Sequence, residues 1–346
     1  MIFRSSTFDC AVDLGTSKLV VTESSGARFE MPSFVAVSRE FGRGSRILAV
    51  GSAAKEYHGR TNDSVDVVRP IARGVVANQV LSAELVHHAL VKVGLVSKKQ
   101  AFFARGPRVL VSHPIELSPV EQKAFARSCL DAGASKVSLV AEPLAAGAAV
   151  FEDHWSSSSK MIVDFGAGVI EAVAFSGRGI LAHSSMRWGS DDIDSDIEKY
   201  LQQMHHLIIG PLTAEDIKQR ACRIVFTGEP TIDVRGFDLI TRKPKRVAIT
   251  CREIRQLMKP RTDMLVQGIV RAFERIPESA FEEIARRGLV ITGGGAWLKG
   301  FLDGLETRLN VPVHYDSDPS HSVCRGEFVM MSQPRARVLS LVDSVG

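Results

Sequence analysis

The chain has 346 residues, of which 45% are hydrophobic and 24% charged, a composition typical of a globular protein of one large or two medium domains. Its net charge of +4 is too small to indicate binding to nucleic acid. We find no signal peptide and no apolar run of about 18 residues, so we expect a cytoplasmic chain that does not span a membrane. The five cysteines are widely spaced and include no Cys-x-x-Cys pair, so we expect reduced, mostly buried thiols.

The first half of the chain is predicted to begin with strands and to continue with helices. Its clearest helix start is at 119–132, where Ser118, Pro119 and Glu121 form the pattern of a capping box. The other expected elements are a hairpin over 10–23, strands at 34–37, 47–50, 109–111 and 137–140, and helices over 78–94 and 144–151.

The second half repeats this alternation. We expect strands at 160–164, 171–176, 180–182, 231–235, 246–249, 289–292 and 311–315, and helices over 191–204, 214–225, 251–275 and 297–309. A duplicated α/β layout of this kind predicts two facing lobes with a cleft between them.

Three glycine-rich turns, far apart in the sequence, each follow an apolar strand. They are Asp13–Ser17, Asp164–Gly168 and Gly293–Ala296. Glycine lets backbone amides approach a phosphate, and an acidic residue beside phosphates suits a hydrated Mg²⁺. Together the turns predict one nucleotide held between two halves of the chain.

These motifs, in this order, resemble the actin-like ATPase superfamily and, within it, the MreB group of bacterial actin homologues. The resemblance extends over nearly the full length. Beyond the three turns it is carried by the segments MPSFVA (31–36), VGSAAK (50–55), GRT (59–61), RPIARGV (69–75), RVLV (108–111), AGA (132–134), EPLAA (142–146) and RRGL (286–289).

The resemblance implies an α/β fold of the actin-like, two-lobed ATPase type. It consists of duplicated ribonuclease-H-like domains, each with a small inserted subdomain. The first large subdomain is expected at 1–31, 70–152 and 319–346, and the first small one at 32–69. The second large subdomain is expected at 153–186 and 250–318, and the second small one at 187–249.

The resemblance also implies a site for ATP and Mg²⁺. Gly15, Thr16 and Ser17 match the first phosphate loop, and Gly166, Ala167 and Gly168 match the second. Asp13 and Asp164 are expected to orient Mg²⁺ through water, with Asp164 counted as catalytic. Glu142 matches the carboxylate that positions the attacking water. On the nucleoside side the matching residues are Gly189, Ser190, Asp191, Lys218, Gly293, Gly294, Gly295 and Ala296.

Ser190 stands where the family pattern has a second glycine, and Ala141 where many MreB proteins have an acid. Three further departures bear on activity. Val169 and Ile170 stand where MreB proteins have two threonines, which removes hydroxyl groups near the attacking water. Arg220 replaces an acid that commonly meets the ribose hydroxyls, and a guanidinium cannot accept hydrogen bonds. Lys18, next to the first turn, is expected to be an ordinary surface lysine.

Residues 94–107 match the place of a membrane-contacting loop in the family. Phe102 and Phe103, flanked by Lys98 and Lys99, suit insertion into the headgroup region of an anionic membrane. The alternative is a loop whose phenylalanines fold back onto the core. No segment is an unmistakable filament interface; Phe237, Leu239 and Ile240 are candidates.

The function implied is that of a filament-forming cytoskeletal ATPase on the inner face of the cytoplasmic membrane. Its expected partners are further copies of itself, that membrane, and the membrane proteins of cell-wall elongation, with a role in cell shape and peptidoglycan synthesis. Two alternatives stay open: a filament protein with weak or absent ATPase activity, because of the three departures, and a monomeric kinase of the same superfamily.

Overall fold

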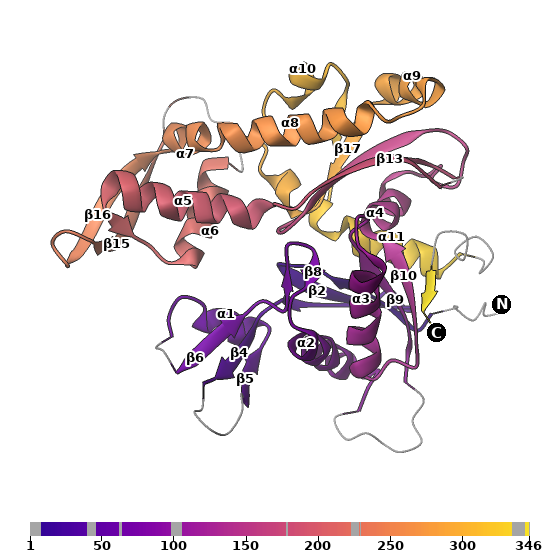
Figure 1. The fold of residues 1–346 in the computed structure, drawn as a ribbon, viewed down its shortest axis with the longest axis horizontal. Coiled ribbons are helices and arrows are strands. Elements are labelled where there is room, and N and C mark those ends of the chain that lie inside the picture. Colours follow the sequence, from indigo (N-terminus) through magenta and orange to yellow (C-terminus); the bar gives the residue numbers. More distant parts are fainter. Residues whose placement is uncertain are drawn as a thin grey trace. The chain divides into compact units, whose positions relative to one another are not determined.

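The structure is a computed structural model that describes residues 8–39, 46–61, 64–97, 106–177, 179–222, 228, 230–333 and 343–345. The chain divides into two compact units (Figure 1). The first comprises residues 1–158, 175–180 and 320–346, and the second comprises 159–174 and 181–319. The finer division into large and small subdomains stays a prediction.

A six-stranded sheet in the order β19-β10-β9-β1-β2-β3 forms the centre of the first unit. Strands β1, β9 and β10 are parallel, whereas β2 and β3 continue β1 as an antiparallel meander. The short β19 pairs antiparallel with β10. The bounds are Cys10–Leu14 (β1), Lys18–Glu23 (β2), Arg28–Pro32 (β3), Arg108–His113 (β9), Lys136–Ala141 (β10) and Asp343–Val345 (β19).

Alternate side chains of this sheet face two different pairs of helices. Val12 on β1 shares a buried apolar cluster with Leu85 on α2 and Phe125 on α3. Asp13 and its neighbour Ser112 on β9 point to the opposite face, because successive strand residues alternate. On that face α11 packs against β1, β2, β9 and α4 (Figure 1). The helices are Gln79–Lys92 (α2), Pro119–Asp131 (α3), Glu142–Val150 (α4) and Ser322–Met331 (α11).

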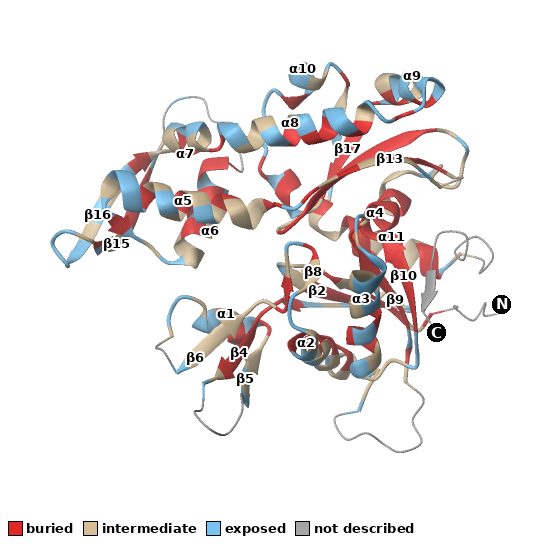
Figure 2. Ribbon diagram, in the orientation of Figure 1, coloured by how far each residue is buried: buried red, intermediate tan, exposed pale blue. Residues whose placement is uncertain are grey.

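Helices α4 and α11 approach closely because a glycine lies at their contact. A Cβ added to Gly326 would lie 1.6 Å from the carbonyl oxygen of Ala145. Gly147, two residues after Ala145 on α4, meets the ring of Phe175 in the same way, with a Cβ-to-ring distance of 2.5 Å. Figure 2 shows α4 buried over most of its length, which agrees with this packing.

The second unit repeats the strand order of the first. Its sheet runs β13-β12-β11-β17-β18, which matches β3-β2-β1-β9-β10 position by position. Strands β11, β17 and β18 are parallel, as their counterparts are. This duplication confirms the α/β, actin-like fold class predicted for the chain. The bounds are Lys160–Phe165 (β11), Ile170–Ser176 (β12), Gly179–Met186 (β13), Leu289–Thr292 (β17) and Val313–Tyr315 (β18).

Smaller sheets are inserted between the third and fourth strands of each repeat. In the first unit they are β5-β4-β6, with α1 packed on it, and the hairpin β7-β8. In the second unit the inserted sheet is β14-β15-β16. The bounds are Val35–Ser38 (β4), Arg46–Val50 (β5), Ser52–Tyr57 (α1), Val65–Val68 (β6), Ile71–Ala72 (β7), Val75–Val76 (β8), Leu207–Ile208 (β14), Thr231–Asp238 (β15) and Pro244–Thr250 (β16).

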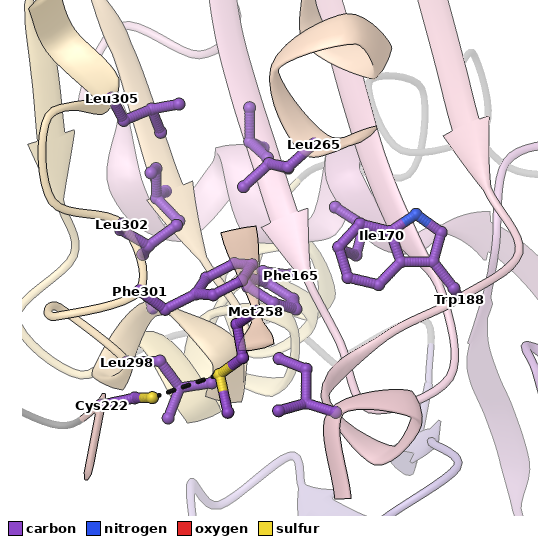
Figure 3. Packing of buried hydrophobic residues seen from close by; sticks show 14 of the residues in the cluster. Phe165, Ile170, Trp188, Cys222, Met258, Leu265, Leu298, Phe301, Leu302 and Leu305 are labelled. Atoms are coloured by element: carbon purple, nitrogen blue, oxygen red, sulfur yellow. Dashed lines mark hydrogen bonds between the residues drawn. The ribbon is translucent and has the colours of Figure 1, made fainter. Parts of the chain in front are cut away.

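One apolar core joins the sheet and helices of the second unit (Figure 3). Phe165, at the end of β11, lies at its centre, with its ring centroid 6.1 Å from Trp188 and 5.7 Å from Phe301. The surrounding helices are Ser190–His205 (α5), Pro211–Cys222 (α6), Cys251–Leu257 (α7), Lys259–Phe273 (α8), Glu278–Arg287 (α9) and Leu305–Leu309 (α10).

Two predicted helices are wrong in extent. The helix expected over 251–275 is two helices, α7 and α8, because Pro260 has no N–H to continue the ladder and Met258 ends α7. The helix expected over 297–309 is reduced to α10 and the 3₁₀ turn Gly294–Trp297. Gly304, in a left-handed conformation with φ of 74°, lies between them and interrupts the helix.

The five cysteines are free and buried, as predicted. No helix of the described residues is both long and apolar enough to cross a bilayer.

Candidate functional site

The first glycine turn joins β1 to β2 and is held by two other segments of the first unit. The Gly15 N–H donates to the Lys18 carbonyl at 3.1 Å, which closes the turn. Ser33 braces it twice: its hydroxyl donates to the Gly15 carbonyl at 2.8 Å, and its N–H donates to the Ser17 carbonyl at 2.9 Å. The Gly74 N–H lies 3.5 Å from the Thr16 hydroxyl. Ser17 is exposed, so its hydroxyl is accessible to a ligand.

Asp13 and Glu142 lie at the same edge of the first sheet. Asp13 is near the carboxyl end of β1 beside Ser112, and Glu142 directly follows β10, whose Ala141 lies beside His113. Because the three strands are parallel, both carboxylates come to one edge, separated by β9. Glu142 is the first residue of α4 and is only 8% exposed. The structure therefore brings together the predicted acid of the first turn and the predicted water-positioning acid.

The second glycine turn, in the second unit, is bonded to the loop that begins α5. The Gly166 N–H donates to the Val169 carbonyl at 3.0 Å, as Gly15 does to Lys18. The Ser190 N–H donates to the Gly166 carbonyl at 3.1 Å, and the Asp191 N–H to the Ala167 carbonyl at 3.0 Å. A Cβ on Gly189 would meet the Ala167 backbone at 2.4 Å, so only glycine allows this approach. The second glycine turn and the loop at Gly189–Asp191, which were predicted as separate parts of the site, are thus joined by backbone hydrogen bonds.

Asp164 is buried and is oriented by a residue that the sequence did not single out. The Thr292 hydroxyl, at the end of β17, donates to the Asp164 Oδ1 atom at 2.9 Å. Asp164 is 5% exposed and Thr292 is fully buried. Burial raises the pKa of the Asp164 carboxyl to about 6, and the hydrogen bond from Thr292 acts in the opposite direction. A nearby cation favours the ionised form of such a carboxyl, so its chemistry fits Mg²⁺.

Replacing Thr292 with Val is expected to lower the free energy of unfolding near neutral pH by about 1–3 kcal/mol, because it removes the donor to a buried carboxylate. The folded-state pKa of Asp164 is above its ordinary value, so this carboxyl lowers stability as the pH rises from about 4 to about 6. At about pH 5 the Asp164 carboxyl is mostly protonated in the folded protein. The Thr292→Val substitution is therefore expected to lower the free energy of unfolding by less at this pH than near neutral pH.

Urea unfolding at the two pH values measures this difference. Thr292→Ser keeps the hydroxyl and is the matched control, expected to retain most of the stability. An equal loss at both pH values in the Val variant would show that packing, not the hydrogen bond, is responsible.

The third glycine turn packs against the second. A Cβ on Gly293 would lie 2.8 Å from the Asp164 Oδ1 atom, and one on Gly295 would lie 2.2 Å from the Phe165 ring. Gly295 and Ala296 are buried, whereas Gly294 is exposed with no heavy atom within 4 Å of a built Cβ. The absence of a side chain at Gly295 is therefore required by the core, and Gly294 is the residue of this turn open to a ligand.

Lys218 on α6 is tied to the α5 loop. Its ammonium donates to the Ser190 carbonyl at 2.9 Å and to the Asp194 carboxylate at 2.7 Å, and its side chain is 7% exposed. Burial raises the pKa of the Asp194 carboxyl to about 7, while the Lys218 charge acts in the opposite direction. Lys218 thus fixes the loop at Ser190. Asp194, which lies on α5, was not predicted as part of the site.

The residues that depart from the family pattern have structural roles of their own. Ile170 is fully buried in the core of the second unit, and Val169 is 8% exposed. Arg220 is half exposed and pairs with Asp216 at 3.5 Å along the surface of α6. Its guanidinium therefore lies on a different face of the helix from the buried Lys218.

Lys18 is not an ordinary surface lysine. Its side chain is 28% exposed, and its ammonium lies 2.9 Å from the Glu30 carboxylate and 2.8 Å from the His321 Nε2 atom. The expectation failed because both partners are distant in sequence. The predicted membrane residues Phe102, Phe103, Lys98 and Lys99 lie outside the described residues. Of the candidate filament contacts, Ile240 is 70% and Phe237 40% exposed, and Leu239 is half-buried.

Comparison with known sequences gives one family over nearly the whole chain. The profile of the family described as MreB/Mbl protein matches residues 7–338. The chain is 31% identical over 326 residues to the cell shape-determining protein Mbl of Bacillus cereus, covering 93% of this chain and 95% of that one. It is 31% identical over 322 residues to the cell shape-determining protein MreB of Escherichia coli, covering 92% and 91%.

Solved structures agree with the fold. The structure of MreB5 of Spiroplasma citri bound to ADP matches with a TM-score of 0.84 at 23% identity, covering 93% of this chain and 95% of that one. The same protein bound to AMPPNP matches equally well. A MamK double helical filament matches with a TM-score of 0.72 at 19% identity, covering 94% of this chain and 99% of that one.

Proposed function

The chain belongs to the MreB/Mbl family, and on that premise we propose that it binds ATP with Mg²⁺ and assembles with copies of itself into cytoskeletal filaments. The curated relatives are named for determining cell shape. A structurally similar protein was solved with ADP and with AMPPNP, and another was solved as a filament. A role in cell shape follows as part of the proposal.

The proposal rests mainly on the two backbone hydrogen bonds that join the second glycine turn to the start of α5. Gly166 and Ala167 accept hydrogen bonds from Ser190 and Asp191 through their carbonyl groups. A turn fixed in this way can direct its remaining N–H groups toward an anion without rearrangement. The first turn has the same closure from Gly15 to Lys18, which supports a matching role for it toward phosphate.

Within this proposal the residues have distinct roles. Thr16 and Ser17 offer hydroxyl groups to phosphate oxygens, and Gly294 leaves room for the base. Asp13 and Asp164 are the carboxylates for which we propose a role toward Mg²⁺ through water. A bound Mg²⁺ supplies positive charge that offsets the charge of the phosphates.

Glu142 is the proposed catalytic residue of ATP hydrolysis. As a carboxylate at the start of a buried helix it can orient a water molecule and accept its proton. Val169 and Ile170 lack the hydroxyl groups that the family pattern has at these positions, so we expect slow hydrolysis. Losing the partner of one buried hydrogen-bonding group typically costs about 1–3 kcal/mol of free energy.

Two measurements on the full chain test the proposal. Isothermal titration calorimetry with Mg²⁺ and ATP is expected to show binding, and ultracentrifugal pelleting with electron microscopy is expected to show filaments that depend on the nucleotide. Absence of both binding heat and pelleted polymer would overturn it. Binding without polymer would instead favour a monomeric enzyme of the same superfamily.

We extend the proposal to the inner face of the cytoplasmic membrane and to the membrane proteins of cell-wall synthesis. Two adjacent aromatic residues, Phe102 and Phe103, beside Lys98 and Lys99 have the composition of a shallow membrane anchor. Co-sedimentation with anionic vesicles is expected to fall in a Phe102→Ser/Phe103→Ser variant, and undiminished binding would exclude this anchor.

A further inference from the structure

The segment that leads from β13 into α5 is attached to α8 at two points. Met186, the last residue of β13, packs so closely on Gly268 of α8 that an added Cβ would lie 2.1 Å from the Met186 Sδ atom. Two residues after Met186, the Trp188 ring has its centre 5.3 Å from the guanidinium carbon of Arg261. Arg261 and Gly268 both lie on α8, about two turns apart, so they share one face of the helix. The segment therefore follows α8 as far as Trp188.

The Trp188 indole is held by contacts of its ring alone. It is 5% exposed, and within the described residues its N–H group has no hydrogen-bond partner. A buried tryptophan usually has such a partner. The ring instead meets Phe165 edge-on, with the two centroids 6.1 Å apart at an angle of 72° (Figure 3), and the Arg261 guanidinium lies over the ring. The attraction of this cation for the ring therefore helps to orient the indole.

Arg261 also binds α5. Its Nε and Nη2 atoms donate to the two carboxylate oxygens of Asp196 at 2.7 and 3.2 Å, a paired geometry that fixes the plane of the guanidinium. These hydrogen bonds raise the pKa of the Arg261 guanidinium above its ordinary value, burial acts in the opposite direction, and the charge of Asp192 adds to the rise. One charged side chain thus joins α8, α5 and the residue that precedes α5.

The residues around Arg261 enclose Gly189, the N-cap residue of α5. Trp188 directly precedes Gly189, and the Asp192 carboxylate accepts a hydrogen bond from the Gly189 N–H at 3.0 Å. Directly after Gly189, the N–H groups of Ser190 and Asp191 donate to the second glycine turn. A displacement of Trp188 would therefore pass to the backbone that carries these two hydrogen bonds.

We propose that Arg261 is a positioning residue for the nucleotide site: its guanidinium holds Trp188 and Asp196 on α8 and so keeps the start of α5 in the conformation that a bound nucleotide requires. This inference rests on the proposed function. It predicts that the planar, forked guanidinium is what matters. Lysine keeps the charge but has neither the fork nor the flat surface, so it is expected to replace arginine only in part.

Calorimetry of the full chain with ATP and Mg²⁺ tests the inference on Arg261→Met, which keeps an unbranched apolar stem and removes the guanidinium. This variant is expected to bind ATP about three- to tenfold more weakly, the equivalent of about one hydrogen bond. Arg261→Lys is expected to bind about two- to threefold more weakly.

The matched control is Arg308→Met. Arg308 on α10 pairs with Asp263 on α8 at 2.7 Å, so this variant also removes an arginine from an ion pair with a carboxylate in the second unit. Its affinity for ATP is expected to stay within about twofold of the wild type.

Hydrogen exchange of the same proteins without nucleotide, followed by mass spectrometry, separates positioning from general stability. Peptides that cover 187–192 are expected to exchange faster in Arg261→Met than in the wild type, and at the wild-type rate in Arg308→Met, because only the first substitution loosens the start of α5. Exchange that is unchanged in this segment, or equally faster throughout the second unit, would overturn the inference.

The affinities distinguish failure of the inference from failure of the proposed function. Wild-type affinity of Arg261→Met would overturn the inference alone. Arg261→Lys takes its place if the Met variant does not fold, and wild-type affinity of that variant would have the same meaning. A wild-type chain that binds no ATP would overturn the proposed function and, with it, the role of Arg261 toward a nucleotide.

Discussion

Phosphate release from ATP is expected to fall by about 10²–10⁴-fold when Glu142 is replaced with Gln, the range typical of losing a general base. The amide keeps the size of the side chain but cannot accept a proton from water. The side chain is held in place by its helix, since α4 contacts Phe175 at Gly147 and α11 at Ala145. A group fixed in this way cannot easily be replaced by a neighbouring residue that moves.

The comparison needs a binding control and a matched variant. Calorimetric affinity for ATP is expected to be unchanged in Glu142→Gln, because the residue acts on water and not on the nucleotide. Glu152→Gln, an exposed acid just after α4, is expected to hydrolyse ATP at the wild-type rate. Equal rates for Glu142→Gln and the wild type would remove Glu142 from the mechanism.

Replacing Gly326 with Ala is expected to lower the free energy of unfolding of the first unit by about 3 kcal/mol or more, the upper part of the range for overpacked cores. The added Cβ would lie 1.6 Å from the Ala145 carbonyl oxygen and 3.2 Å from the Ala149 nitrogen. Backbone atoms cannot turn aside as a flexible side chain can, so the two helices must move apart. That movement would displace Glu142 through α4.

Urea unfolding and ATP binding together measure this effect. Gly210→Ala is the matched control, because a Cβ there has no heavy atom within 4 Å. It is expected to change stability by less than about 1 kcal/mol. A Gly326→Ala protein as stable as this control would mean that α11 and α4 can separate without loss, which would contradict the close packing described above.

Strand ends and glycine turns were predictable from the sequence because their chemistry is local. An apolar run that stops at Asp13 or Asp164 and turns through glycine is a pattern within a few residues. The repeated strand order follows from two such patterns leading into helices. For the same reason the capping box at Ser118 and Glu121 was correctly predicted, with both of its hydrogen bonds present.

The contacts that position the site were not predictable, because they join residues that are distant in sequence. Thr292 meets Asp164 only because β17 lies beside β11. Ser33 meets Gly15 only after β3 has turned back along β2. The helix break at Met258 and Pro260 was missed because apolar periodicity continues across it.

The position of α11 in the chain has a consequence for how the protein is made. Residues 320–346 belong to the first unit although they follow the whole of the second. During translation, the second unit can therefore be completed before the first, which begins earlier. Until α11 emerges from the ribosome, the face of the first sheet that carries Asp13 and the side of α4 that packs against α11 are uncovered. The nascent chain thus exposes this apolar face until residues 320–346 have been synthesised, and the first glycine turn acquires its full surroundings only after the second unit has been made.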